Sequence, residues 1–284
     1  MGAIREGVGL SPVLTKGLGG SVATSGADAI VRRPLYVLAA GRTSVDLDGP
    51  ALLVRAKDRA DARYPLSRVS RVITSARVEW RARALAACLQ HGIPLVFTGA
   101  ENTPLGYLLP AVRTLSRLSR DLEEFLDRPD WREHHHDWLR AERMRLFARW
   151  QRSREEAGKP LPQETLCELK RRYVYLDERS EVLAPDGLLS TAIRAAVAER
   201  LHKAGLGAVY WGFRGEAFHL LEDVSRLLEL VLHLEWHGLG EVAHFEGAAI
   251  LRMFHAFAFS LTTHCDDILG HLHRYLKSLL EEWR

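Results

Sequence analysis

Cysteine is scarce in this sequence: the 284 residues contain three, Cys88, Cys167 and Cys265, which lie far apart along the chain. An odd number of isolated cysteines argues against a disulfide framework and is typical of a reducing, cytoplasmic environment. Long apolar runs are missing too, since no stretch reaches the roughly 18 residues that span a bilayer. The first residues have no apolar core of signal-peptide length. We therefore expect a cytoplasmic protein that is neither exported nor inserted in a membrane.

A strong excess of one charge is also missing. The chain has 39 basic and 36 acidic residues, a net charge of +3 and 47% hydrophobic residues, which is the balance of an ordinary globular protein. The total charge therefore indicates no particular partner, and nucleic-acid binding has to be judged from local clusters. Most of the basic residues are arginines, which suit bidentate phosphate contacts, although a general bias towards arginine explains the composition equally well.

The first part of the chain has the pattern of a small β-rich domain. Residues 1–33 are rich in glycine, serine and alanine and are expected to form a flexible leader. From residue 34 onwards, short apolar or alternating runs are separated by turn signals such as Asp48-Gly49-Pro50. Helical periodicity covers residues 78–90 and stops before Gly92, a normal signal for a helix C-terminus. We expect residues 34–110 to form strands around one helix.

After Pro110 the periodicity becomes helical, with apolar residues three or four positions apart. The sequence predicts a larger, all-helical domain over residues 111–284, and hence an α+β fold. The expected helices cover residues 112–126, 131–156, 163–172, 188–204, 216–237 and 241–283, the last of them interrupted near Gly270.

Several short motifs follow one another in the order typical of one protein family. They lie at residues 64–69 (YPLSRV), 86–97 (AACLQHGIPLVF), 104–108 (PLGYL), 139–145 (LRAERMR), 188–190 (LLS) and 212–213 (GF). Through this ordered set, the chain resembles the CRISPR-associated integrase family, the larger subunit of the spacer-acquisition complex. The resemblance extends from about residue 34 to residue 235.

The resemblance implies a DNA integrase and nuclease that joins the 3′-ends of a short DNA fragment to a repeat array. It also implies a homodimer that associates with DNA and with a small second subunit. In that family a divalent metal is held by a glutamate on one helix, a histidine just after the Gly-Phe pair, and an acidic residue on the next helix. Mg²⁺ or Mn²⁺ suits such oxygen ligands and neutralises charge on the attacked phosphodiester.

The ligand positions of that pattern are changed in this sequence. Aligning the helix after Gly212-Phe213 places Asp223 on the first acidic position and Arg226 on the metal-binding one. The histidine falls in a gap, and the glutamate falls on Arg172 or Tyr173. We therefore expect no metal cofactor and no catalysis of its own. The chain would instead bind DNA, or pair with an active paralogue or with the small second subunit.

Two other interpretations remain open. If the alignment is shifted, the chain is an active integrase that uses Mg²⁺ or Mn²⁺ bound by Glu164, Glu168, His219 and Asp223, with Glu156 as a further candidate. A chain that has lost DNA binding as well would be a scaffold subunit. A nuclease assay separates an active integrase from an inactive DNA-binding protein, and salt-dependent DNA affinity separates the latter from a scaffold.

The densest basic stretch lies in the helix expected over residues 131–156 and continues into the next helix. Arg145, Arg149 and Arg152 share one helical face, as a track along a phosphate backbone requires. The alternative is a solvated face paired with neighbouring glutamates. The residues expected to bind DNA are Arg140, Arg143, Arg145, Arg149, Arg152, Lys170, Arg171, Arg172, Arg214 and Arg226.

Two histidine-rich stretches imitate metal sites without the required spacing. The consecutive residues His134 to His136 point in three directions on a helix, so they cannot jointly bind a metal and are expected at the surface. His233, Glu235 and His237 imitate a zinc-protease helix, but in that motif the glutamate directly follows the first histidine. We expect no zinc site there.

Overall fold

The computed structural model describes residues 32–38, 42–57, 59–99, 101–111, 116–175, 187–207, 210, 218–237 and 248–283. The chain divides into two compact units, with the boundary between Ala111 and Val112. A β-rich region is followed by a helical one, so the α+β class expected from the sequence is confirmed. The expected leader, residues 1–33, lies outside the described residues except at its end, where Arg33 already begins the first strand.

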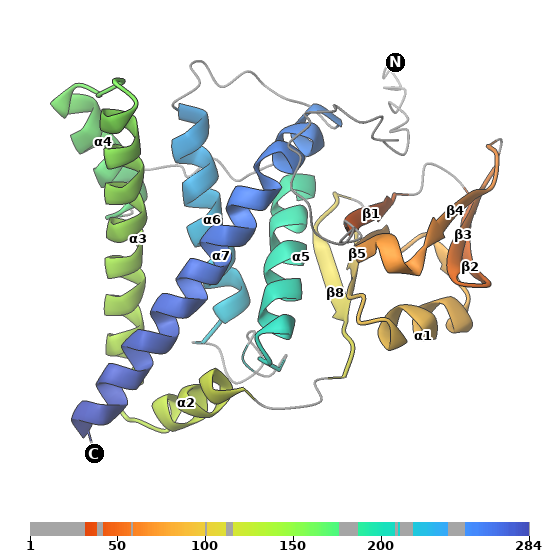
Figure 1. Ribbon diagram of the computed structural model, residues 1–284, viewed down its shortest axis with the longest axis horizontal. Helices are drawn as coiled ribbons and strands as arrows, with labels where there is room; N and C mark the ends of the chain where they lie inside the picture. Colours follow the sequence, from red (N-terminus) through yellow and green to blue (C-terminus); the bar gives the residue numbers. More distant parts are fainter. Residues whose placement is uncertain are drawn as a thin grey trace, which may run out of the picture. The chain divides into compact units, whose positions relative to one another are not determined.

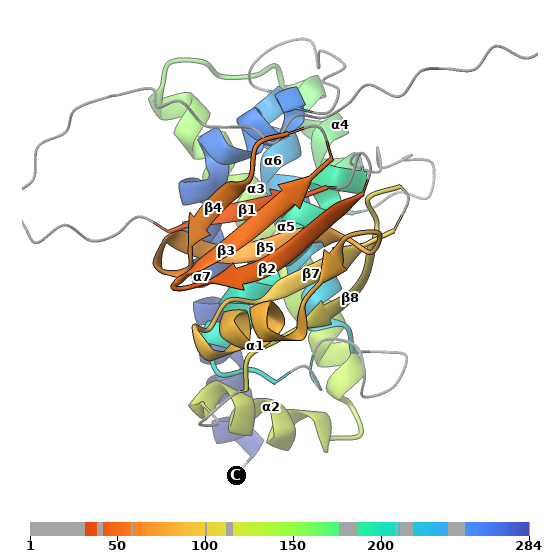
Figure 2. The same cartoon turned by 90° about the vertical axis from the view of Figure 1, so that its right-hand side faces the viewer.

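The first unit contains two four-stranded sheets. The strands are β1 Arg33–Val37, β2 Thr43–Asp48, β3 Ala51–Ala56, β4 Ala62–Pro65, β5 Val69–Ser75, β6 Glu79–Trp80, β7 Leu95–Thr98 and β8 Pro104–Leu108. One sheet has the order β1-β5-β7-β8, in which β1, β5 and β7 run parallel and β8 runs antiparallel to β7. The other has the order β4-β3-β2-β6, and Figure 2 shows its first three strands side by side.

Side chains from both sheets form the core of this unit. Val45 and Leu52 of one sheet and Val72 of the other are fully buried, and Cys88 of helix α1 (Ala82–Gln90) joins the same cluster. The chain leaves α1 at Gly92, whose φ of 69° is a left-handed conformation that glycine adopts without a Cβ clash. The turn signals and the alternating pattern therefore give the β-rich unit that the sequence indicates.

The helix predicted over residues 78–90 begins only at Ala82, because Glu79 and Trp80 form strand β6 beside β2. The indole Nε1 of Trp80 donates a hydrogen bond to Oγ1 of Thr74 at 3.0 Å. These tertiary contacts outweigh the local helical periodicity at the start of the segment.

The second unit is built from helices (Figure 1). They are α2 Arg117–Leu126, α3 Trp131–Glu156, α4 Gln163–Tyr173, α5 Gly187–Lys203, α6 Leu220–His237 and α7 Ala248–Trp283. α5 is buried on most of its faces and packs against α6 and α7, while α3 packs against α6 and α2 against α7. Within the described residues, no helix combines the length and the apolar character needed to cross a membrane.

The helices lie close to their expected positions, with two differences. Phe218 and His219, which were expected to be helical, precede the start of α6 at Leu220. α7 continues through Gly270, where a break was expected. Leu269 and Leu272 on either side of this glycine are buried, and their packing offsets the roughly 1 kcal/mol by which glycine weakens a helix relative to alanine. The expected helical residues 112–115, 216–217 and 241–247 lie outside the described residues.

Replacing Leu52 by alanine should lower the free energy of unfolding by about 2–5 kcal/mol, because it empties a fully buried position in the core between the sheets. Urea unfolding followed by circular dichroism measures the change. Leu105→Ala is the matched control, since Leu105 on β8 is 66% exposed. This control should change the stability by about 0.5 kcal/mol or less. If both variants lose the same free energy of unfolding, Leu52 does not lie in the core as described.

The three cysteines should differ in reactivity. Burial raises the pKa of the Cys88 and Cys265 thiols to about 12, whereas Cys167 is exposed on α4. Since the thiolate is the reactive form, a chromogenic thiol reagent should label Cys167 alone in the native protein and all three after denaturation. A second thiol that reacts quickly in the native state would contradict the burial of Cys88 or Cys265.

Candidate nucleic-acid interface

Helices α3 and α6 meet at a contact between a histidine and an aspartate that the sequence did not predict. His135 of α3 is 7% exposed, and its Nε2 lies 3.4 Å from Oδ2 of Asp223 on α6. The rings of Trp131, Trp138 and Phe218 surround the imidazole at centroid distances between 5.1 and 6.3 Å. The two groups therefore face each other in apolar surroundings, where Coulombic interactions are screened less than in water.

The expected surface position of the three consecutive histidines holds for one of them only. His136 is exposed, whereas Nε2 of His134 lies 3.2 Å from Oδ2 of Asp130, and its carbonyl oxygen accepts a hydrogen bond from Tyr275 at 3.1 Å. His135 is buried because it lies on the face of α3 that packs against α6. As expected, the three side chains do not share one direction.

Three of the arginines expected to bind DNA come together beside the contact between His135 and Asp223. Arg143 of α3 lies within Coulombic reach of Asp223, and of Arg140 and Arg226. Its Nε donates a hydrogen bond to the carbonyl oxygen of Val174, just after α4, at 3.2 Å. Burial is the main cause that lowers the pKa of Arg143, and the two neighbouring arginines add to the effect. The cluster therefore has more positive than negative charge at close range.

Arg140 and Arg226 complete this cluster. The guanidinium of Arg140 lies 5.6 Å from the ring centroid of Tyr175, a tyrosine that is 50% exposed. Nε of Arg226 lies 3.1 Å from Oε1 of Glu222, and the Arg226 side chain is 70% exposed. Glu222 also pairs with Arg194 of α5 at 2.7 Å, so two guanidiniums share one carboxylate.

Arg145 and Arg149, also expected to bind DNA, are paired inside the unit. Nε of Arg145 donates to Oε2 of Glu142 at 2.8 Å, and the Glu142 side chain is 3% exposed. Arg149 reaches α7, where its Nη1 lies 2.7 Å from Oδ2 of Asp267. His271 of α7 lies 3.8 Å from Glu142. The helical face predicted to follow DNA is thus partly directed at α7, and DNA contacts by these two arginines would have to break the pairs.

Other residues expected to bind DNA lie near the ends of α3 and α4 or outside the described residues. Arg152 is exposed near the end of α3. Lys170, Arg171 and Arg172 form the last turn of α4, where positive charge is favoured by the helix dipole. Arg214 lies outside the described residues.

The candidate metal ligands are not gathered in one place. Glu164 and Glu168 are exposed on α4, His219 is exposed before α6, and Asp223 pairs with His135. In the part of the chain that the structure describes, no group of three or more His, Cys, Asp or Glu side chains could hold a metal ion. The guanidiniums near Asp223 also repel a divalent cation. The described side chains around Asp223 therefore do not fit the metal that the resemblance implies.

His233, the first histidine of the stretch that imitates a zinc motif, packs against aromatic rings. His233 stacks on the ring of Tyr173 at 5.8 Å and lies edge to face with Trp236 at 5.9 Å. Burial lowers the pKa of His233.

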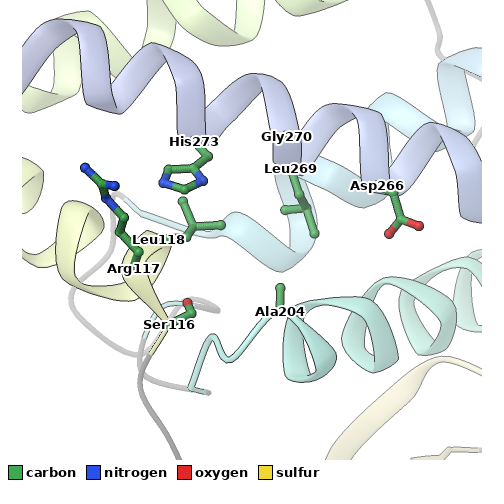
Figure 3. A pocket seen from close by; sticks show the side chains of 8 residues that line it. All are labelled: Ser116, Arg117, Leu118, Ala204, Asp266, Leu269, Gly270 and His273. Carbon is green, nitrogen blue, oxygen red and sulfur yellow. The ribbon is translucent and has the colours of Figure 1, made fainter.

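A hollow of about 340 Å³ lies between the beginning of α2, the end of α5 and the middle of α7 (Figure 3). Its lining residues are Ser116, Arg117, Leu118, Ala204, Asp266, Leu269, Gly270 and His273. Nε of Arg200 donates to Asp266 at 2.8 Å, and Nε2 of His273 lies 3.1 Å from Oδ2 of Asp121. Since the carboxylate of Asp266 is already paired with Arg200, this hollow is a weaker candidate for a charged ligand than the arginine cluster.

Sequence reasoning missed the burial of Glu142, although a signal for it exists. Trp138, Glu142, Leu146 and Trp150 recur every four residues on α3, and all four are buried. A glutamate inside such an apolar stripe needs a cation nearby, and Arg145 is three residues away. The sequence has no comparable signal for Tyr175, because its contact with the guanidinium of Arg140 depends on the tertiary structure.

Replacing Glu142 by glutamine should lower the free energy of unfolding by about 3 kcal/mol, because the guanidinium of Arg145 then stays partly buried without a carboxylate. Adding Arg145→Met should restore part of the loss, since both charges are then gone. Denaturant titration measures both. Glu156→Gln, at the exposed end of α3, is the control and should change the stability by about 0.5 kcal/mol at most. If Glu142→Gln is as stable as Glu156→Gln, the pair of Glu142 and Arg145 does not have the proposed role in stability.

Several solved structures have a similar fold. A Cas1 protein from Thermotoga maritima is 13% identical, with a TM-score of 0.60 over 86% of this chain and 97% of that one. A casposase bound to an integration product is 11% identical, with a TM-score of 0.56 over 87% and 91% of the two chains. A chain of a Cas6-RT-Cas1–Cas2 complex is 13% identical, with a TM-score of 0.52 over 89% of this chain and 36% of that one. At these identities the likeness concerns the fold.

The comparison with curated proteins finds no match. The sequence model of one family does match, over residues 35–192, and its description is CRISPR associated protein Cas1. The matched region covers more than half of the chain. It contains the strands and the α1 segment of the first unit, together with α3, α4 and the beginning of α5. The chain therefore belongs to the Cas1 family of CRISPR-associated proteins.

Proposed function

We propose that this Cas1-family protein binds DNA during spacer acquisition without carrying out metal-dependent strand chemistry itself. The single observation that carries the proposal is Arg226, which stands one helical turn after Asp223 where the family pattern has a metal-binding acid. A guanidinium cannot be a ligand of a cation, but it binds phosphate oxygens in bidentate geometry. The exchange therefore removes one function and favours another.

The contacts around Asp223 support this proposal. Its carboxylate has His135 as a partner, and Arg143 lies within Coulombic reach of it. Mg²⁺ and Mn²⁺ need several oxygen ligands and lose affinity when positive side chains stand beside the site. An arginine-rich surface needs no metal to attract a phosphodiester backbone.

The proposed partners follow from the family. One similar structure is a casposase bound to an integration product, and another is a complex that contains Cas1 and Cas2. We propose that this chain likewise contacts DNA, forms a homodimer, and works beside a small second subunit of the Cas2 kind or beside a catalytically active paralogue. Such a partner would supply the strand-joining chemistry.

Incubated with Mn²⁺ and a branched DNA, the purified protein should yield no cleaved or joined strands, although it binds the same DNA. Denaturing gels detect products, and fluorescence anisotropy measures affinity. The logarithm of the binding constant should fall linearly with the logarithm of the salt concentration, because phosphate contacts release counterions. A Cas1-family protein with its ligands intact serves as the positive control for the nuclease assay.

Two results would overturn the proposal. Manganese-dependent products would identify an active integrase, and Glu164, Glu168, His219 and Asp223 would then need to be tested as ligands. Absence of salt-dependent DNA binding would instead identify a scaffold subunit.

A further inference from the structure

The three arginines beside Asp223 are each held by one group. Arg143 uses its Nε for the carbonyl oxygen of Val174, and Arg226 uses its Nε for Glu222. Arg140 has its planar face against Tyr175. A guanidinium has five N–H donors, so each side chain is oriented and still has donors left for a ligand.

The charges around the cluster are not balanced. Arg140 and Arg143 have no carboxylate within ion-pair distance among the described residues. Glu222 is shared between Arg194 and Arg226, and Asp223 is engaged by His135. Glu229 of α6 also lies within Coulombic reach of Arg194 and Arg226. The four guanidiniums around this α3–α6 contact therefore outnumber the three carboxylates near them. Partial burial makes the excess costly, because a desolvated charge without a counter-charge is unfavourable.

We infer that Arg140, Arg143 and Arg226 form an anion site that holds a phosphoryl group directly, without a divalent metal. This inference deepens the proposed function, since it assigns the phosphate contact to the position where the family pattern has its metal-binding acid. The three side chains come from α3 and α6, which meet where Nε2 of His135 lies 3.4 Å from Oδ2 of Asp223. The shared ligand chemistry is a phosphate oxyanion, either in a DNA backbone or as free phosphate.

Fluorescence anisotropy with a labelled oligonucleotide in EDTA tests the site. Arg143→Gln and Arg226→Gln should each weaken binding by roughly tenfold, the usual effect of losing a charge-assisted hydrogen bond, and should reduce the salt slope by about one. Arg120→Gln is the matched control, because Arg120 is exposed on α2 and the variant loses the same charge. The control should keep the affinity of the unchanged protein.

A second measurement separates the two sources of phosphate. Inorganic phosphate should raise the melting temperature of the unchanged protein relative to chloride at equal ionic strength, and the shift should disappear in Arg226→Gln. Because the Arg226 side chain is 70% exposed, this variant should fold even if Arg143→Gln does not. Phosphate should also compete with the oligonucleotide when both occupy the same site.

Tyr175 offers an independent control of the geometry. Tyr175→Leu should weaken oligonucleotide binding by roughly two- to fivefold, because Arg140 loses the ring that positions it. Trp283→Leu is matched, since Trp283 is also exposed and has the guanidinium of Arg128 4.7 Å from its ring centroid. Arg128, however, is already neutralised by Asp130. The Trp283 variant should therefore bind DNA as the unchanged protein does.

The outcomes distinguish the anion site from the proposed function. DNA binding that is unaffected by Arg143→Gln and Arg226→Gln overturns the anion site and leaves the proposed function in place. A phosphate-dependent stability shift without DNA binding supports the anion site and overturns the proposed function. DNA binding that is lost in EDTA and restored by Mg²⁺ contradicts the anion site.

Discussion

The contact between His135 of α3 and Asp223 of α6 brings two helices together and thereby places the arginines on them. The imidazole lies among aromatic rings, so burial of apolar surface supports the contact. Sliding α6 by one turn along α3 would separate the two side chains and expose the rings, which makes alternative registers unfavourable. Arg226 follows Asp223 by one turn and is thereby brought to Arg143. The positive cluster is thus a consequence of how the two helices pack.

Helix α3 has two faces with different electrostatic roles. On the face toward α7, Arg145 and Arg149 neutralise Glu142 and Asp267, so these charges serve the cohesion of the helical unit. On the other side, Arg143 has a backbone carbonyl as its hydrogen-bond partner. A surface that attracts phosphate needs cations that the fold has not already paired. Along this one helix, the arginines that support stability are therefore different from those proposed to bind phosphate.

The fold and the chemistry of this family depend on different numbers of residues. A structure can be kept at 13% identity because many apolar positions share the task of filling a core, as Val45, Leu52 and Val72 do in the first unit. Metal chemistry depends on a few ligands at fixed places, and one change of charge there is enough to lose it. A Cas1-family chain with Arg226 beside Asp223 is in keeping with this asymmetry.

The sequence by itself determined the fold class, the strands on either side of Gly49, and the extents of α3 and α4. These elements follow from hydrophobic periodicity and turn residues, which act between near neighbours in the chain. Only the tertiary structure decided that Glu79 and Trp80 form a strand, that His135 is buried, and that Arg149 pairs with Asp267, a residue 118 positions away. Periodicity shows which side chains share a helical face, but the neighbour that meets this face is set by packing between distant segments. For that reason an arginine-rich face could be found in the sequence, while its division into paired and unpaired cations could not.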